Sequence, residues 1–342
     1  MEESRERDAS QQARRDVLAR SQGSERRDEA LLRYVTTATH EYKAEAAMTE
    51  PPSTTAEHTP IVVGIDGSEP SLAAARWGAA EARRRHLPLR LVHAYRWPFV
   101  AASPAAPPVG WSEATLRQDA EALVAAAVRA VVADAGEVPV AGRAIEGPTA
   151  AVLVKASAQA CLVVLGHRSR GGIASLLLGS VAAAVCAHAH GPVVVVRQTL
   201  DATRPTEPIV VGVDGSPGGD RAIGFAFAEA DLRGLPLIVA HAWNPPSRGE
   251  VAPFSDSVAE LETAELHQMR EWVHLWQEKF QHVPVSHRLI AAHPALALID
   301  LSRHATLLVI GSRGRGGFTG LLLGSVSQQA LHHAHCPVAI IR

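Results

Sequence analysis

Short apolar runs alternate with longer Ala- and Leu-rich stretches from residue 61 onward. In the first half of the chain, runs rich in Val, Ile and Leu predict strands at 61–65, 89–94, 138–145, 162–165 and 193–197. Helices are expected after Ser68, a candidate N-cap, and at about 112–134, 149–160 and 181–188. Near-continuous apolar strands separated by helices are typical of a parallel sheet covered on both faces. Right-handed crossovers then predict a doubly wound α/β fold.

The same pattern returns in the second half of the chain. IVVGIDGS at 61–68 returns as IVVGVDGS at 209–216, LVVLGHRSRGG at 162–172 returns as LLVIGSRGRGG at 307–317, and LLLGSV occurs at 176–181 and at 321–326. Repeats of about 140 residues are whole domains rather than modules of a solenoid. We therefore predict two tandem domains, the first repeat (59–198) and the second repeat (207–342). The long helix of the second repeat is expected at about 258–280.

The chain before residue 59 has a different composition. Residues 1–47 are rich in Arg, Glu, Asp, Gln and Ser, and residues 49–60 form a Pro- and Thr-rich linker. A segment with few large apolar side chains buries little surface on its own. We expect residues 1–58 to be a disordered or weakly helical N-terminal extension.

Charge and composition exclude several classes of protein. Lys and Arg number 33 against 35 Asp and Glu, so the net charge of −2 gives no basic excess for nucleic acid. No apolar run approaches the roughly 20 residues of a membrane-spanning helix, and the charged N-terminus has no signal-peptide core. Three scattered cysteines favour a reducing compartment. These features predict a cytoplasmic protein without nucleic-acid or membrane partners.

Two Gly-rich turns in each repeat are candidate ligand-binding loops. They follow the first and the fourth predicted strands, and ligands of doubly wound sheets bind beyond the carboxyl ends of strands where the winding reverses. If these two strands are neighbours, both loops converge on one cleft. In the second repeat the later loop, called here the glycine loop, runs from Gly311 and Gly314 to Gly324 and Ser325, where a helix is expected to begin.

The residue types of the glycine loop suit a phosphate chain. Glycines allow an anion to approach the backbone, a helix start offers unpaired N–H groups, and Arg313 and Arg315 add positive charge. Ser325 and Gln328 match a capping box, which would fix the start of the helix. The loop is not a Walker A motif, since no GK[ST] follows, and no GxGxxG fingerprint follows the first strand.

Asp66 and Asp214 stand at the ends of the first strands of the two repeats. A carboxylate at this place could accept a hydrogen bond from a nucleotide base or ribose. Aspartate before glycine is also an ordinary turn residue. The spacing leaves both interpretations open.

The strand-end Asp, the pattern G-x2-G-x9-G-S before the penultimate helix, and Pro-Val before a last strand together resemble the universal stress protein family, as a tandem pair of its domains. The resemblance covers essentially everything but the N-terminal extension. It implies, in each repeat, a five-stranded parallel sheet of the Rossmann-like, adenine-nucleotide alpha-hydrolase-like type. It also implies dimerisation through the last strands and, in the ATP-binding branch of the family, a bound ATP.

Carried over position by position, the resemblance implies a nucleotide site in each repeat. In the second repeat, Asp214 and the backbone at Ala242 would contact adenosine. Ribose and phosphates would be held there by Gly311, Arg313, Gly314, Gly324, Ser325 and Val326. The corresponding set in the first repeat is Asp66, Ala94, Gly166, Arg168, Gly179, Ser180 and Val181.

The first repeat departs from the family pattern at Ser169, which replaces the second glycine of the loop. A Cβ costs on the order of 1 kcal/mol or clashes if this position needs a positive φ or a close approach of phosphate. The first repeat also has Ala183 where the second has Gln328, so its loop lacks the capping box. We therefore predict an asymmetric pair in which the second repeat binds ATP more tightly.

Other features are assigned structural roles. The predicted strands 193–197 and 338–342 are apolar edges, so they are expected to pair with each other as an internal pseudo-dimer, with a homodimer of chains left open. The Arg-rich stretch at 83–85 is interpreted as a solvated helix end. His93 and His241 are expected to be buried and hydrogen-bonded. The His and Cys residues near 186–190 and 332–336 do not have zinc-site spacing, so no metal site is predicted.

Three functions remain open on the sequence. The leading hypothesis is an ATP-binding regulator of a stress or dormancy response, with Mg²⁺ as an open question and an unknown protein partner. No base or Mg²⁺ ligand set is evident for fast phosphoryl transfer, so weak hydrolysis at most is expected. The alternatives are a slow ATPase or adenylate-forming enzyme, and a nucleotide-free interaction module.

Overall fold

The computed structural model describes residues 59–96, 112–167, 178–197, 206–243, 258–315 and 323–342, and the structural statements below concern these residues. The predicted N-terminal extension (1–58), Arg168 and Ser169 lie outside them. Within the described ranges, no helix has the length and apolar character needed to cross a membrane.

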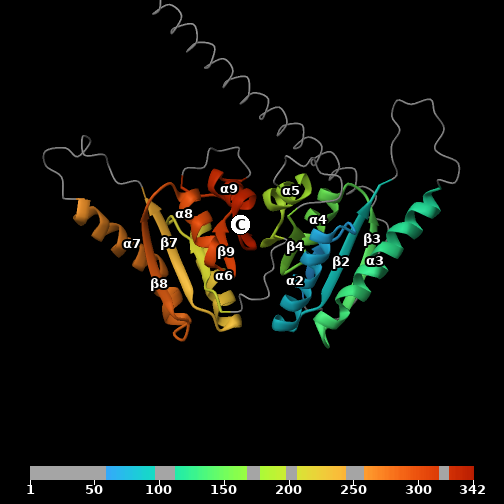
Figure 1. Ribbon diagram of the computed structural model, residues 1–342, viewed down its shortest axis with the longest axis horizontal. Coiled ribbons are helices and arrows are strands. Elements are labelled where there is room, and N and C mark those ends of the chain that lie inside the picture. Colours follow the sequence, from blue (N-terminus) through green and yellow to red (C-terminus); the bar gives the residue numbers. More distant parts are fainter. Residues whose placement is uncertain (1–58, 97–111, 168–177, 198–205, 244–257, 316–322) are drawn as a thin grey trace, which may run out of the picture. The chain divides into compact units, whose positions relative to one another are not determined.

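Strands and helices alternate along the first repeat, as its sequence pattern predicts (Figure 1). The strands are β1 (Ile61–Gly64), β2 (Leu89–Tyr95), β3 (Val140–Glu146), β4 (Leu162–Gly166) and β5 (Val193–Val196). The helices are α2 (Glu69–Arg85), α3 (Glu113–Ala135), α4 (Thr149–Ser157) and α5 (Ser180–His188). Ser68 is the N-cap of α2 as predicted, and its side chain accepts a hydrogen bond from the amide of Ser71.

The second repeat has the same succession of elements. Its strands are β6 (Ile209–Gly212), β7 (Leu237–Trp243), β8 (Val285–Ala291), β9 (Leu307–Gly311) and β10 (Val338–Ile341). Its helices are α6 (Pro217–Arg233), α7 (Val258–Lys279), α8 (Pro294–Leu301) with the short 3-10 turn η2 (Ser302–His304), and α9 (Ser325–His333).

The sheet order confirms the doubly wound fold. Five parallel strands in the order β3-β2-β1-β4-β5 form the half-sheet of the first repeat, and β10-β9-β6-β7-β8 form that of the second. The two half-sheets join into one ten-stranded sheet, because β5 and β10 pair antiparallel with Val194 opposite Ala339. Each half reverses its winding between its first and fourth strands, which is where such folds place their ligands.

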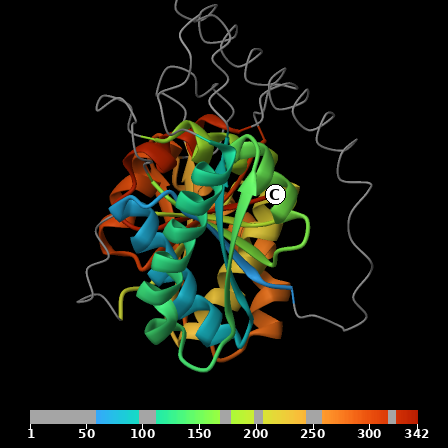
Figure 2. The ribbon, with the colours of Figure 1, turned by 90° about the vertical axis from the view of Figure 1, so that its right-hand side faces the viewer.

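Both faces of the sheet are buried under helices. Neighbouring residues of a strand point to opposite faces, so Ile61 and Val63 belong to one core cluster and Val62 to the other. The first cluster includes residues of α2, α3, α6 and α7, and the second includes residues of α4, α5, α8 and α9. In Figure 2, α3 lies along the edge strand β3, with which it is in contact.

Helices α2 and α6 meet across the seam, the name used here for the junction of the two repeats. Glu81 and Glu229 are fully buried, and each pairs with Arg85 and with Arg233. Arg85 Nε and Arg233 Nη2 both lie 2.6 Å from Glu81 carboxylate oxygens. The prediction that residues 83–85 form a solvated helix end is therefore wrong for Arg85. The local sequence does not show that Arg85 pairs with Glu229, which belongs to the other repeat.

The charges at the seam compensate one another. Burial, the largest influence, acts to raise the pKa of Glu81, yet the charges of Arg233 and Arg85 bring that pKa below its ordinary value. Glu81 and Arg85 of α2 occupy the same places in the repeat as Glu229 and Arg233 of α6. The four-residue cluster is thus the same contact made twice.

The last arginine of each repeat also crosses the seam. Arg197, after β5, donates from Nη1 to the carbonyl oxygens of Leu331 and His332 in the last turn of α9, at 3.1 Å each. Arg342, after β10, donates to the carbonyl of Ala187 in the last turn of α5. A cation at a helix C-terminus satisfies free carbonyls and opposes the helix dipole. Each repeat therefore caps a helix of the other.

Candidate functional site

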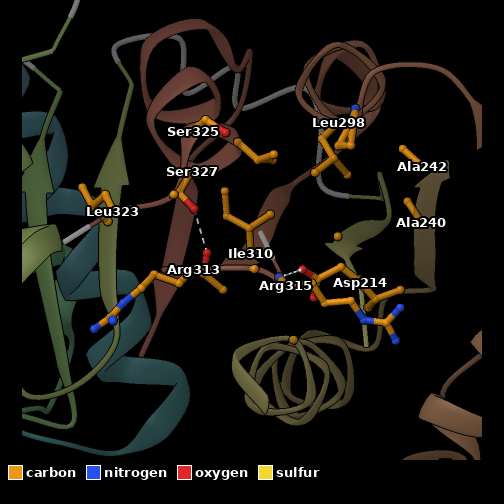
Figure 3. A pocket seen from close by; sticks show the side chains of 18 of the residues that line it. Asp214, Ala240, Ala242, Leu298, Ile310, Arg313, Arg315, Leu323, Ser325 and Ser327 are labelled. Atoms are coloured by element: carbon orange, nitrogen blue, oxygen red, sulfur yellow. Dashed lines mark hydrogen bonds between the residues drawn. The ribbon is translucent and has the colours of Figure 1, made fainter. Parts of the chain in front are cut away.

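A cavity of the second repeat opens beyond the carboxyl ends of β6 and β9, which are paired neighbours (Figure 3). It has a volume of about 490 Å³. The turn after β6 and the glycine loop after β9 both line it. The predicted convergence of the two loops on one cleft is confirmed, and it follows from the reversal of winding at this point.

All eight residues predicted for the second-repeat site line this cavity. They are Asp214, Ala242, Gly311, Arg313, Gly314, Gly324, Ser325 and Val326. The four elements β6, β7, β9 and α9, or their ends, bring them together, although the residues span more than a hundred positions of the chain. Apolar side chains of Leu298, Ile310 and Leu323 complete the wall.

The carboxylate of Asp214 holds the two loops together. Its Oδ1 accepts the amide hydrogen of Ser216 at 3.0 Å, and its Oδ2 accepts that of Arg315 at 2.8 Å. Gly215, which lies between Asp214 and Ser216 in the chain, has a φ of 71°, a conformation that disfavours a side chain. Asp214 is therefore both a turn residue, as one interpretation expects, and the tie that fixes the glycine loop against the β6–α6 turn.

At two glycines of the loop, neighbouring atoms lie so close to the backbone that a Cβ would crowd them. A Cβ at Gly314 would overlap Oδ2 of Asp214, and one at Gly311 would lie 3.1 Å from the carbonyl carbon of Gly218. The backbone is thus packed closely against its neighbours at both positions. Ser169 takes the place of Gly314 in the first repeat and lies outside the described residues.

Helix α9 begins at the cavity, but the capping-box prediction is wrong. Gly324 is the N-cap and makes no side-chain cap, so Ser325 is already the first helical residue. Gln328 then falls one position beyond the place a capping box requires. The amide of Gly324 instead donates to the carbonyl of Ser312 at 2.8 Å, which fixes the helix start through the backbone.

Ser327 supports the site and was not predicted. Its hydroxyl donates to the carbonyl of Gly311 at 2.8 Å, while its oxygen also lies 3.4 Å from the carbonyl of Ser312. The side chain joins the first turn of α9 to the start of the glycine loop. The only signal in the sequence is that a Ser replaces Ala182 of the first repeat at a buried helical position.

The two arginines of the loop extend in different directions. Figure 3 shows the side chain of Arg313 pointing away from Asp214, whereas the guanidinium of Arg315 lies on the Asp214 side. The carbon Cζ of Arg315 lies 5.0 Å from the ring centroid of Trp272 on α7, in a cation–π contact. The pKa of Arg342, the last residue after β10, is lowered first by burial and then by the charge of Arg313.

A histidine behind the cavity has the predicted buried, hydrogen-bonded role. Nδ1 of His241 lies 2.7 Å from the carbonyl oxygen of Val213, and its Nε2 lies 3.4 Å from Glu265. Nδ1 of His93 makes the equivalent contact with Ile65 at 2.8 Å in the first repeat. Both imidazoles therefore brace the turn that follows the first strand.

The equivalent cavity of the first repeat is smaller, with a volume of about 220 Å³. Of the residues predicted for it, Asp66, Gly166, Gly179 and Val181 line it. Ala94 and Ser180 are not among its lining residues, and Arg168 lies outside the described part of the chain. The structure thus assembles four of the seven predicted residues of this repeat around one cavity.

Metal-binding groups do not gather in the part of either cavity that the structure describes. Among the described residues, no three His, Cys, Asp or Glu side chains are arranged to hold a metal ion. Cys186, one of the His and Cys residues near 186–190, is fully buried in α5, and burial raises the pKa of its thiol to about 12. This cysteine therefore has the environment of a packing residue.

The fold and the site define a tandem doubly wound α/β protein with a ligand-sized cavity at the point where the strand order reverses. The family profile described as the universal stress protein family matches residues 57–197 and 205–342. The chain therefore belongs to the universal stress protein family, and the resemblance inferred from its motifs is confirmed.

Individual proteins resemble this chain to different degrees. A universal stress protein of Mycobacterium tuberculosis is 40% identical over 288 residues, which are 82% of this chain and 96% of the relative. A universal stress protein structure from Archaeoglobus fulgidus covers 83% of this chain and 98% of its own, with 18% identity and a TM-score of 0.63, and so shares the fold. Another universal stress protein, solved in complex with cAMP, is 26% identical over 40% of this chain, with a TM-score of 0.31.

Proposed function

We propose that this protein is an ATP-binding universal stress protein that regulates a stress or dormancy response. Its nucleotide would occupy the cavity of the second repeat. The observation that carries the proposal is the meeting of a strand-end carboxylate, a glycine loop and a helix start around one cavity at the switch point. Such a place combines a polar anchor with backbone donors for phosphate.

The residues present fit an adenine nucleotide. A volume of about 490 Å³ falls within the roughly 300–1,000 Å³ of small-molecule sites. The backbone at Ala242 and the carboxylate of Asp214 would hold adenosine. The first amides of α9, at Ser325 and Val326, belong to the helix turn that leaves N–H groups without intrahelical partners, so they would donate to phosphate.

Glycines and arginines complete the phosphate side. Gly311 and Gly314 let the loop backbone pack closely against Gly218 and Asp214, where a Cβ would be too near, and this packing holds the loop at the phosphate side of the cavity. Arg313 and Arg315 add two positive charges at the cavity, the second of them beside Trp272. We propose that a partner protein recognises the nucleotide-bound form of the chain in the cytoplasm.

The proposal favours binding over rapid turnover. Asp214 is the one carboxylate among the described lining residues of the cavity, and both of its oxygens already accept backbone hydrogen bonds. A carboxylate used in this way is poorly placed to activate water. Hydrolysis is therefore expected to be slow, whether or not Mg²⁺ accompanies the nucleotide.

Copurified nucleotide tests the function. The full chain is purified without added nucleotide and denatured, and the released small molecules are identified by mass. Calorimetry with ATP, with and without Mg²⁺, then measures affinity. Retained or titratable adenine nucleotide with little phosphate release supports the proposal. Multiple turnover would indicate an ATPase or adenylate-forming enzyme instead, and flat titrations would indicate a nucleotide-free interaction module.

A further inference from the structure

We infer that two side chains close the first repeat to nucleosides, so that the chain binds one nucleotide rather than two. They are Val92 and Ser71, which stand where the second repeat has Ala240 and Gly219. The inference rests on the proposed function of the second repeat. According to this inference, the side chains at these two positions determine whether a repeat has room for a nucleoside.

The two cavities differ in how far they extend along the sheet. The second-repeat cavity is lined by Ala240 and Ala242 of β7 as well as by residues of β6 and β9. The first-repeat cavity touches β1 and β4, but neither Val92 nor Ala94 of β2 lines it. The first-repeat cavity therefore lacks the part next to β2, which corresponds to the place beside β7 where adenosine is proposed to lie in the second repeat.

Strand register places Val92 and Ala240 at equivalent points. Val92 pairs with Gly64 in β1, and Ala240 pairs with Gly212 in β6. Both side chains point to the same face of the sheet, since they belong to the same core cluster. At this point of the sheet Val92 carries two more methyl groups than Ala240, and it is only 1% exposed.

Ser71 narrows the same cavity from the helix side. It lines the first-repeat cavity, its hydroxyl donates to the carbonyl of Ser68 at 2.8 Å, and its oxygen lies 3.3 Å from the amide of Asp66. Gly219 has no side chain at this point, and a Cβ there would lie 3.1 Å from Oδ1 of Asp214. A side chain on this helix turn thus fills the space beside the strand-end carboxylate.

The closed repeat retains the phosphate side of the site. Gly166, Gly179 and Val181 line its cavity, just as their counterparts line the larger one. Its volume of about 220 Å³ nevertheless lies below the roughly 300 Å³ at which small-molecule sites begin. The first repeat therefore keeps the strand-end and helix-start residues of the site without room for a nucleoside.

Exchanging the side chains between the repeats tests the inference. The opened variant carries Ser71→Gly, Val92→Ala and Ser169→Gly in the full chain, and Ser169→Gly alone is its matched control. The closed variant carries Ala240→Val. Equilibrium dialysis with labelled ATP measures the number of sites, and circular dichroism with urea unfolding verifies that each variant is folded.

The wild type is expected to bind one equivalent, the opened variant two, and the Ser169→Gly control one. Ala240→Val is expected to weaken binding about 10-fold or more, because one or two extra methyl groups in a filled pocket change affinity by about 10–200-fold. Two equivalents in the wild type, or a folded opened variant that still binds one, would overturn the inference. If the opened variant does not fold, unchanged affinity of Ala240→Val would overturn it alone. A wild type that binds no nucleotide would instead refute the proposed function.

Discussion

The two repeats are alike where they meet and differ at their cavities. At the seam, Glu81 and Arg85 of α2 recur as Glu229 and Arg233 of α6, and the last arginine of each repeat caps a helix of the other. At the cavities, Val92 of the first repeat stands where the second has Ala240, and Ser71 stands where the second has Gly219. An interface made of equivalent surfaces needs both copies, whereas a ligand needs only one cavity.

Physical cost explains why the seam stays symmetric. Each buried glutamate pairs with two arginines, one from each helix, so changing one member leaves charges of both repeats without compensation. A cavity that holds no ligand carries no such penalty, and apolar side chains that fill it improve packing. Mutations at the seam and mutations at the cavities therefore test this difference between the two regions.

The largest effect is expected at the seam. Glu229→Ala removes one of the two carboxylates that pair with Arg233, whose side chain is only 6% exposed, and one of the two that pair with Arg85. It should lower the free energy of unfolding by about 3–5 kcal/mol. Urea unfolding followed by circular dichroism measures it. The matched control is Glu271→Ala in α7, which removes an exposed ion pair with His267 and should cost less than about 0.5 kcal/mol. Equal losses in the two variants would contradict the role of the seam.

The next effect separates the two strand-end carboxylates. Asp214→Ala removes the acceptor of two backbone hydrogen bonds and a proposed nucleoside contact, so ATP affinity should fall about 10–100-fold. Asp66→Ala is the matched variant in the first repeat and should leave ATP affinity unchanged. Calorimetry on each single variant measures the difference. Equal losses of affinity would show that both repeats bind, against the asymmetry proposed here.

Much of this architecture could be predicted from the sequence. Runs such as those containing Ile61 and Val193 are apolar on both faces, which identifies buried parallel strands, and the repeat of every strand and glycine turn identifies two copies. The reversal of winding then placed Asp214 and Gly311 at one cleft. These inferences succeed because they depend on periodicity, repetition and chain order, all of which the sequence itself contains.

The parts that could not be predicted depend on contacts between distant residues. Arg85 looks like one of three solvated arginines until Glu229 of the other repeat is placed beside it. The closure of the first cavity depends on the face to which Val92 points and on the glycine opposite it. No local pattern distinguishes these residues from ordinary surface and core residues.

A smaller effect is expected from the hydroxyl that joins α9 to the glycine loop. Ser327→Ala removes the hydrogen bond to the carbonyl of Gly311, which should cost about 1 kcal/mol, or roughly 5-fold in ATP affinity. Urea unfolding and calorimetry together show whether the loss falls on stability or on binding. Ala182→Ser introduces the same hydroxyl into the first repeat and should leave ATP affinity unchanged. A Ser327→Ala variant that binds and unfolds like the wild type would contradict this role.

The smallest effect tests how the start of α9 is fixed. Gln328 is exposed and lies one position beyond that of a capping-box partner, because Gly324 rather than Ser325 is the N-cap. Gln328→Ala should therefore change the free energy of unfolding by less than about 0.5 kcal/mol and leave ATP affinity unaltered. The backbone hydrogen bond from Gly324 to Ser312 does not involve this side chain, so the helix start should persist. A loss near 1 kcal/mol would mean that the glutamine does cap the helix. The first repeat, which has Ala183 at this position, would then lack a stabilising contact and not merely an exposed amide.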